Sequence, residues 1–98
     1  MENDEMITLE VVCINYEIEP SFIDSLLEYG LLEITTVENT RFLEMKRIRD
    51  LERWIHLHYD LDINLEGIQT ISHLLERVTH LQDELSMLRN RLQFYENL

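Results

Sequence analysis

The chain contains few residues that break helices and no long apolar run. One proline (Pro20) and two glycines (Gly30 and Gly67) occur in 98 residues, which leaves little room for many tight turns and favours helices over a β-sandwich. No run of about 18 apolar residues is present, so no membrane span is expected. The first residues are acidic and lack the features of a signal peptide. The single cysteine, Cys13, cannot form an internal disulfide, and the cytoplasm is therefore the expected compartment.

Basic residues are also scarce. Eight Lys and Arg stand against 20 Asp and Glu, which gives a formal net charge of -12. The imbalance is concentrated in residues 1–44, where eleven acids accompany Arg41 as the single base. A surface of this sign repels phosphates and attracts basic protein partners. The acids could equally serve only to keep the protein soluble, and composition does not separate the two interpretations.

Residues 8–30 predict a helix-turn-helix. Thr8 can cap a short helix, although the β-branched residues of the 7–14 segment also allow a strand. The apolar positions of this helix share one face: Leu9, Val12, Cys13 and Tyr16. Pro20 suits the first position of a second helix, and Gly30 suits a left-handed stop behind it. Two helices, a tight turn and a glycine stop are typical of the helix-turn-helix motif.

The remaining elements complete a single, mostly α-helical domain with a winged helix-turn-helix. Residues 31–43 predict a wing of two short strands that turn at Glu38-Asn39, and residues 44–60 predict a third helix. Residues 1–7 are assigned to an acidic tail. The third helix carries the chain's one basic cluster: Lys46, Arg47, Arg49 and Arg53.

A long C-terminal helix is predicted over residues 64–96, with Asn64 as its N-cap. Its apolar residues recur at steps of three and four: Ile71, Leu74, Val78, Leu81, Leu85, Leu88, Leu92 and Tyr95. This spacing is a heptad seam, which favours a coiled coil. No other predicted element remains to cover the distal turns, so we expect a homodimer formed through Val78, Leu81, Leu85, Leu88, Leu92 and Tyr95. The alternative is an ordinary amphipathic helix that packs within the monomer.

No pattern indicates catalysis, a metal site or a cofactor. His56 and His58 are two residues apart in a predicted helix and therefore point to different faces, while His73 and His80 are separated by about 10.5 Å along theirs. Cys13 lies on an apolar face and is predicted to be a buried, inert thiol. No Gly-rich phosphate loop occurs. The chain is therefore predicted not to be an enzyme and to hold no metal or cofactor.

Several segments resemble known families. The helix-turn-helix, the Gly30-Leu31-Leu32 segment, the wing and the helix with Arg and Trp resemble the head of the MerR group of winged-helix proteins. The segment Asp60-Leu61-Asp62-Ile63-Asn64-Leu65-Glu66-Gly67-Ile68 resembles the "leucine, Asn-Leu-Glu-Gly-hydrophobic" segment of the CbpM family. Leu74-Leu75-Glu76-Arg77-Val78 continues this resemblance. Members of that family have about this length, so the resemblance covers nearly the whole chain.

The resemblance implies a chaperone modulator that binds the J domain of a DnaJ/CbpA-type co-chaperone and inhibits it. J domains present a basic helix to their Hsp70 partner, and an acidic module could cover that helix. The expected contact residues lie around the turn and on the outer side of the second helix: Glu17, Glu19, Asp24, Glu28 and Tyr29. An interface on the third or fourth helix is the alternative.

Two other functions stay open at this stage. The first is a MerR-type transcription regulator that binds DNA through its basic residues: Arg41, Lys46, Arg47, Arg49 and Arg53. The sequence argues against DNA as a partner, however, because the second helix would enter the major groove and residues 20–29 contain two acids and no base. The second is an adaptor that only self-associates through the terminal helix.

Overall fold

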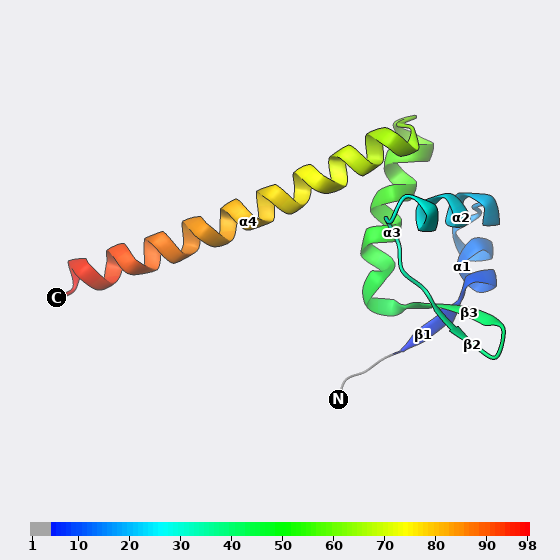
Figure 1. The fold of residues 1–98 in the computed structure, drawn as a ribbon, viewed down its shortest axis with the longest axis horizontal. Coiled ribbons are helices and arrows are strands. Elements are labelled where there is room, and N and C mark those ends of the chain that lie inside the picture. The colour runs from blue at the N-terminus through cyan, green and yellow to red at the C-terminus, as the bar shows by residue number, and fades with distance from the viewer. Residues whose placement is uncertain (1–4) are drawn as a thin grey trace.

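The computed structural model describes residues 5–98, which form a small head with one long helix projecting from it (Figure 1). In chain order the elements are β1 (Met6–Thr8), α1 (Leu9–Tyr16), α2 (Pro20–Glu28), β2 (Thr35–Val37), β3 (Thr40–Glu44), a 3-10 turn (Met45–Arg47), α3 (Ile48–Ile55), a π-helical turn (His56–Asp60) and α4 (Leu65–Glu96). The predicted winged helix-turn-helix with a long C-terminal helix is confirmed. None of the helices within residues 5–98 is both long enough and apolar enough to cross a membrane.

The two helices of the helix-turn-helix begin and end where the sequence predicts. The Thr8 hydroxyl accepts a hydrogen bond from the amide of Val11 at 3.3 Å and so caps α1. At the end of α2, Gly30 takes a left-handed conformation with φ 72°. The amide of Leu31 then reaches the carbonyl of Leu26 at 2.8 Å, which closes the helix with a Schellman motif.

The sheet has one strand more than the sequence predicts. β2 and β3 form the expected wing and turn at Glu38 and Asn39, whose positive φ values of 50° and 67° suit a tight hairpin. Residues 6 and 7, which were assigned to the acidic tail, belong instead to strand β1. This strand pairs antiparallel with the other edge of β3 and places Ile7 opposite Leu43. The rest of that tail, residues 1–4, lies outside the described residues. The assignment of residues 6 and 7 to a tail was therefore wrong, because their backbone groups bond to a strand far along the chain.

The core lies between the two short helices, the sheet and α3. Its buried apolar side chains are Leu9, Val12, Ile18, Phe22, Ile23, Leu26, Leu32, Leu43, Leu51, Trp54 and Ile68. The Trp54 indole N–H donates to the carbonyl of Leu31 at 3.0 Å, which joins α3 to the segment after α2. Ile68 is the one residue of α4 in this set, so α4 is fixed to the head near its first turn.

The junction between α3 and α4 explains the Asn64-Leu65-Glu66-Gly67 segment. The Asn64 side chain accepts a hydrogen bond from the amide of Gly67 at 2.8 Å and caps α4. The Glu66 carboxylate accepts from the Tyr29 hydroxyl at 2.9 Å. A Cβ atom on Gly67 would lie 2.7 Å from Cγ2 of Ile63, so the glycine provides close packing. The segment therefore acts as a joint that holds the start of α4 against the head.

We predict that Gly67→Ala destabilises the protein, although alanine is normally more favourable than glycine in a helix by about 1 kcal/mol. The added methyl group meets Ile63, whose Cγ2 branches directly from Cβ and cannot swing away. The urea midpoint should fall in Gly67→Ala. In an Ile63→Ala background the same change should lower the midpoint less, because only the contact with Oδ1 of Asn64, at 3.1 Å, remains. A higher midpoint for Gly67→Ala alone would contradict this account of the joint.

Candidate protein-binding face

Carboxylates dominate the head, which we define as residues 5–64. This segment contains thirteen Asp and Glu and five Lys and Arg. Two arginines are paired closely: Arg41 Nη1 lies 3.1 Å from Asp24 Oδ1, and Arg47 Nη2 lies 2.8 Å from Glu33 Oε1. Such exposed pairs contribute little stability. They nevertheless place carboxylates beside two of the cations that a phosphate ligand would need.

Four of the five predicted contact residues are exposed near α2. Glu17 follows α1 with a left-handed φ of 55°, and Glu19 occupies the N-cap position of α2, where its side chain accepts no capping hydrogen bond from α2. Asp24 and Glu28 are exposed on α2 itself. Arg41 on the wing donates a hydrogen bond to Asp24, and this contact links the wing to α2. The structure thus places these carboxylates around the turn and along α2.

Tyr29 differs from the four carboxylates because it forms hydrogen bonds to α4. Its hydroxyl donates to Glu66, and its carbonyl accepts from the Gln69 side chain at 2.9 Å. Both partners belong to α4, so Tyr29 links the end of α2 to α4. The hydrogen bond to Glu66 raises the pKa of the Tyr29 phenol. Its observed contacts therefore give this residue a structural role.

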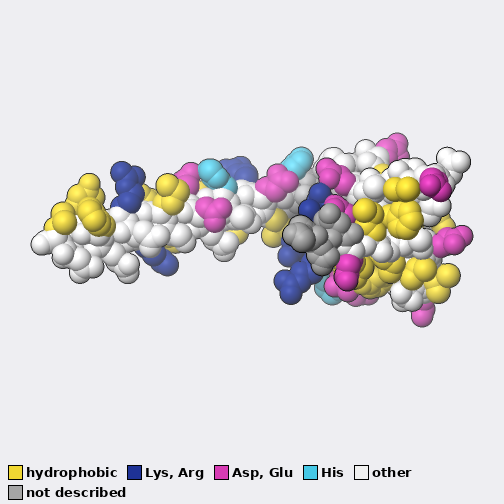
Figure 2. Space-filling view, turned by 90° about the horizontal axis from the view of Figure 1, so that it is seen from below, with side chains coloured by type: hydrophobic (Ala, Val, Ile, Leu, Met, Phe, Trp, Pro, Cys, Tyr) yellow, Lys and Arg dark blue, Asp and Glu magenta, His cyan; other side chains and the backbone are white. Residues whose placement is uncertain are grey.

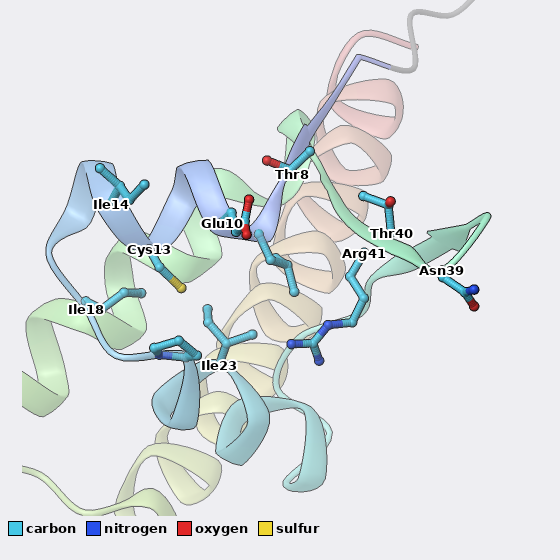
Figure 3. A pocket seen from close by; sticks show the side chains of 11 residues that line it. Thr8, Glu10, Cys13, Ile14, Ile18, Ile23, Asn39, Thr40 and Arg41 are labelled. Carbon is cyan, nitrogen blue, oxygen red and sulfur yellow. The ribbon is translucent and has the colours of Figure 1, made fainter.

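A groove lies between α1, the start of α2 and the wing (Figure 3). Its volume is about 790 Å³. The lining residues are Thr8, Leu9, Glu10, Cys13, Ile14, Ile18, Pro20, Ile23, Asn39, Thr40 and Arg41. Figure 3 shows the side chains of Cys13 and Ile23 turned toward each other, with Arg41 reaching in from the wing. The groove is therefore apolar at its floor and polar along the wall formed by the wing.

Sequence reasoning missed this groove because it assigned Cys13 to the core. The thiol is half-buried and lines the groove, so the prediction of a buried residue was wrong. Burial raises the pKa of the Cys13 thiol, an effect that nearby Arg41 opposes. The sequence of α1 could have indicated this groove, because apolar residues occur on every side of the helix. A helix of this kind is usually covered all round.

The distal part of α4 stands free of the head. The predicted seam residues are exposed as follows: Val78 47%, Leu81 58%, Leu85 48%, Leu88 58%, Leu92 59% and Tyr95 66%. Figure 2 shows apolar side chains gathered at the far end of this helix and others on the head, where acidic side chains surround them. The helix does not fold back on its own domain, and its apolar seam is therefore unpartnered in the described chain.

His56 and His58 form hydrogen bonds within the turn before α4. His56 Nδ1 lies 2.9 Å from Asp60 Oδ2, and His58 Nδ1 lies 3.0 Å from the carbonyl oxygen of Ile63. The His58 ring also stacks on Phe22 with ring centroids 4.8 Å apart. Within residues 5–98, no three His, Cys, Asp or Glu side chains are grouped as a metal site would require. These histidines instead shape the turn that leads into α4.

The joint between Tyr29 and Glu66 predicts a measurable pKa change. The pKa of Glu66 is lowered, first by a hydrogen bond to its own backbone amide and then by the Tyr29 hydroxyl. In Tyr29→Phe the Glu66 pKa should therefore rise but stay below its usual value. The stabilisation that the lowered Glu66 pKa provides is fully present above the ordinary pKa of a glutamate, about 4.3, and is lost as the pH falls through the lowered Glu66 pKa. A carbon-detected NMR titration measures the shift, and Tyr16→Phe is the control because its hydroxyl contacts Glu52 instead. An unchanged Glu66 pKa in Tyr29→Phe would contradict the assignment.

Comparison with known proteins agrees with this architecture. Residues 7–90 match the model of the MerR HTH family of regulatory proteins. The chain is also 29% identical over 86 residues to the chaperone modulatory protein CbpM of Pseudomonas entomophila (strain L48), which covers 86% of this chain and 84% of that protein. Both descriptions name non-enzymatic kinds of protein. The chain therefore belongs to the MerR helix-turn-helix family of regulatory proteins and is similar, within it, to CbpM.

Proposed function

We propose that this protein is a chaperone modulator that binds the J domain of a DnaJ/CbpA-type co-chaperone and inhibits it. The similarity to a chaperone modulatory protein along most of the chain carries this proposal. The acidic head supports it. A J domain offers a basic helix to Hsp70, and a head with thirteen acids and five bases has the charge needed to attract that helix.

Inhibition then follows from competition for one surface. While the basic helix is held by the acidic head, it is not available to Hsp70. Exposed carboxylates at the rim of such an interface mainly raise the association rate, while a few apolar contacts at its centre contribute most of the affinity. We assign the rim to Glu17, Glu19, Asp24 and Glu28, which are all exposed.

DNA binding receives less support from the structure. The second helix of a helix-turn-helix approaches the major groove, and here that helix presents Asp24 and Glu28. Arg41 on the wing would have to leave Asp24 to contact a phosphate. Sequence-specific binding to duplex DNA would require cations in these positions to replace condensed counterions. We therefore do not propose a DNA-reading function.

The proposal predicts a salt-dependent complex with a J domain from the same cell. Calorimetry should give micromolar or tighter affinity at about 150 mM salt, and the affinity should fall as salt rises because the attraction is screened. The protein should also reduce J-domain-stimulated ATP hydrolysis by Hsp70. A gel shift with duplex DNA serves as a control and should show no sequence-selective binding. If no J domain from the cell binds at micromolar concentration, the proposal is wrong.

We propose further that α4 pairs with a second copy of the chain. The apolar residues of its seam recur with heptad spacing and are exposed along the length of the helix. Flanking charges are compatible with pairing in both directions. Glu84 would face Arg89 of the second copy in a parallel, in-register pair, and Arg91 of the second copy in an antiparallel pair that aligns Leu85 with Leu88. Each buried leucine would contribute about 1.5–3 kcal/mol.

Leu85→Lys is expected to disrupt this dimer. It introduces a charge at the middle of the seam, where burial without a partner is costly. Analytical ultracentrifugation should show a dimer for the unmodified protein and a monomer for the variant, with a loss of helical circular dichroism. Asn90→Lys adds the same charge on another face of α4 and should remain dimeric. A monomeric unmodified protein would contradict the proposal.

A further inference from the structure

Helix α1 has an uncovered apolar side. Leu9 and Val12 are buried in the core, whereas Val11 is 43% exposed and Ile14 is 73% exposed. These two residues are three positions apart and therefore share one face of the helix. A short helix with apolar residues on all sides is typical of an interior position. The outer side of α1 is thus suited to contact another molecule.

The outer side of α1 continues into the groove. Ile14 belongs to both, because it also lines the groove that runs from α1 to the wing. Cys13 and Pro20 supply accessible apolar surface to the groove, whereas Ile18 and Ile23, which also line it, are buried in the core. A volume of about 790 Å³ is within the usual range for ligand pockets, about 300–1,000 Å³. Several side chains from one face of a helix fit a space of this size.

The charges around the groove determine the kind of ligand. Glu10 lines it, and three further glutamates adjoin its lining residues in the sequence: Glu17, Glu19 and Glu38. Within residues 5–98, no Lys, Arg or His side chain lies within ion-pair distance of these four carboxylates. Arg41 is the one base in the lining, and Asp24 binds it. A ligand with apolar anchors and basic flanks is complementary to this arrangement.

We infer that the groove and the outer side of α1 bind an amphipathic, basic helix. The apolar stripe of the helix enters the groove against Ile14 and Cys13, and its Lys and Arg side chains face Glu10 and the three neighbouring glutamates. This is the helix-in-groove mode of recognition. The inference rests on the proposed function, for which it identifies the helix as the basic helix of the J domain. It also places the centre of the interface on α1 and the wing, with α2 at one edge.

Cys13 provides a direct test because it is the single cysteine of the chain. Its alkylation by N-ethylmaleimide is measured by mass spectrometry with and without a saturating J domain, and calorimetry establishes saturation independently. A helix in the groove covers the thiol, so the alkylation rate should fall about tenfold or more. Full alkylation in a complex that calorimetry shows to be saturated would overturn the inference and leave the proposed function intact.

Two variants examine the same surface by affinity. Ile14→Ser should weaken J-domain binding about tenfold, as expected for a central apolar contact. Ile14 is exposed and lies outside the core, so the change leaves the core packing intact. Glu10→Lys should weaken binding by repulsion. Leu61→Ser is the matched control, because Leu61 is 54% exposed but lies between α3 and α4. Affinities within twofold of the unmodified protein for both groove variants would overturn the inference.

The experiment also separates failure of the inference from failure of the proposed function. If no J domain binds, a synthetic amphipathic peptide of leucine and lysine replaces it as the probe. Saturable protection of Cys13 by this peptide would support the groove as a site for basic helices, and absence of protection would overturn it. The Leu85→Lys variant is also alkylated alone at increasing protein concentration. If Cys13 becomes protected under these conditions, a second copy of the chain occupies the groove, and the inference is overturned.

Discussion

The joint at the start of α4 governs the shape of the whole molecule. Asn64 caps the helix, Gly67 packs closely against Ile63, and Glu66 receives the hydroxyl of Tyr29 from the end of α2. Burial of Ile68 adds an apolar contact to these polar ones. Because these contacts are all within the first two turns, they fix the direction of a helix of 32 residues from one end. The remaining turns project away from the head (Figure 1).

Two separate surfaces result from this arrangement. The seam of α4 is kept away from the head, so pairing with a second copy would not require the head to move. The groove beside α1 is kept free of α4, since α4 contacts the head near α3 and the end of α2. The proposed self-association and the proposed binding of a basic helix would therefore use different residues of the same chain.

The acidic surplus causes electrostatic repulsion within the head, and ion pairs in the fold reduce it. Like charges repel one another in a compact state, and the head reduces this repulsion by pairing Asp24 with Arg41 and Glu33 with Arg47. Glu10 in the groove, and the three glutamates next to its lining residues in the sequence, have no such partner within the described residues. Their repulsion would be relieved by a basic ligand, which gives a physical reason for the head to bind one. The same charges disfavour a phosphate backbone at this surface.

Features with a local or periodic cause could be predicted from the sequence. The caps at Thr8 and Asn64, the stop at Gly30, the turn at Glu38-Asn39 and the long helix depend on neighbouring residues or on regular spacing. The charge of the head is likewise a property of composition. The carboxylates of the candidate face were predicted as a group for this reason, since adjacent positions around one turn stay together in any fold.

Other features depend on residues far apart in the chain, and only the tertiary structure decided them. Met6–Thr8 becomes a strand because β3 supplies its hydrogen-bonding partners. Tyr29 contacts α4 because a carboxylate 37 positions later lies beside it. Cys13 lines a groove because the wing stands apart from α1 there. The sequence by itself determined which segments are helical, where they end and how the charge is distributed, since these follow from short-range interactions. Which faces are covered and which stay open was decided by packing, because it depends on how distant segments meet.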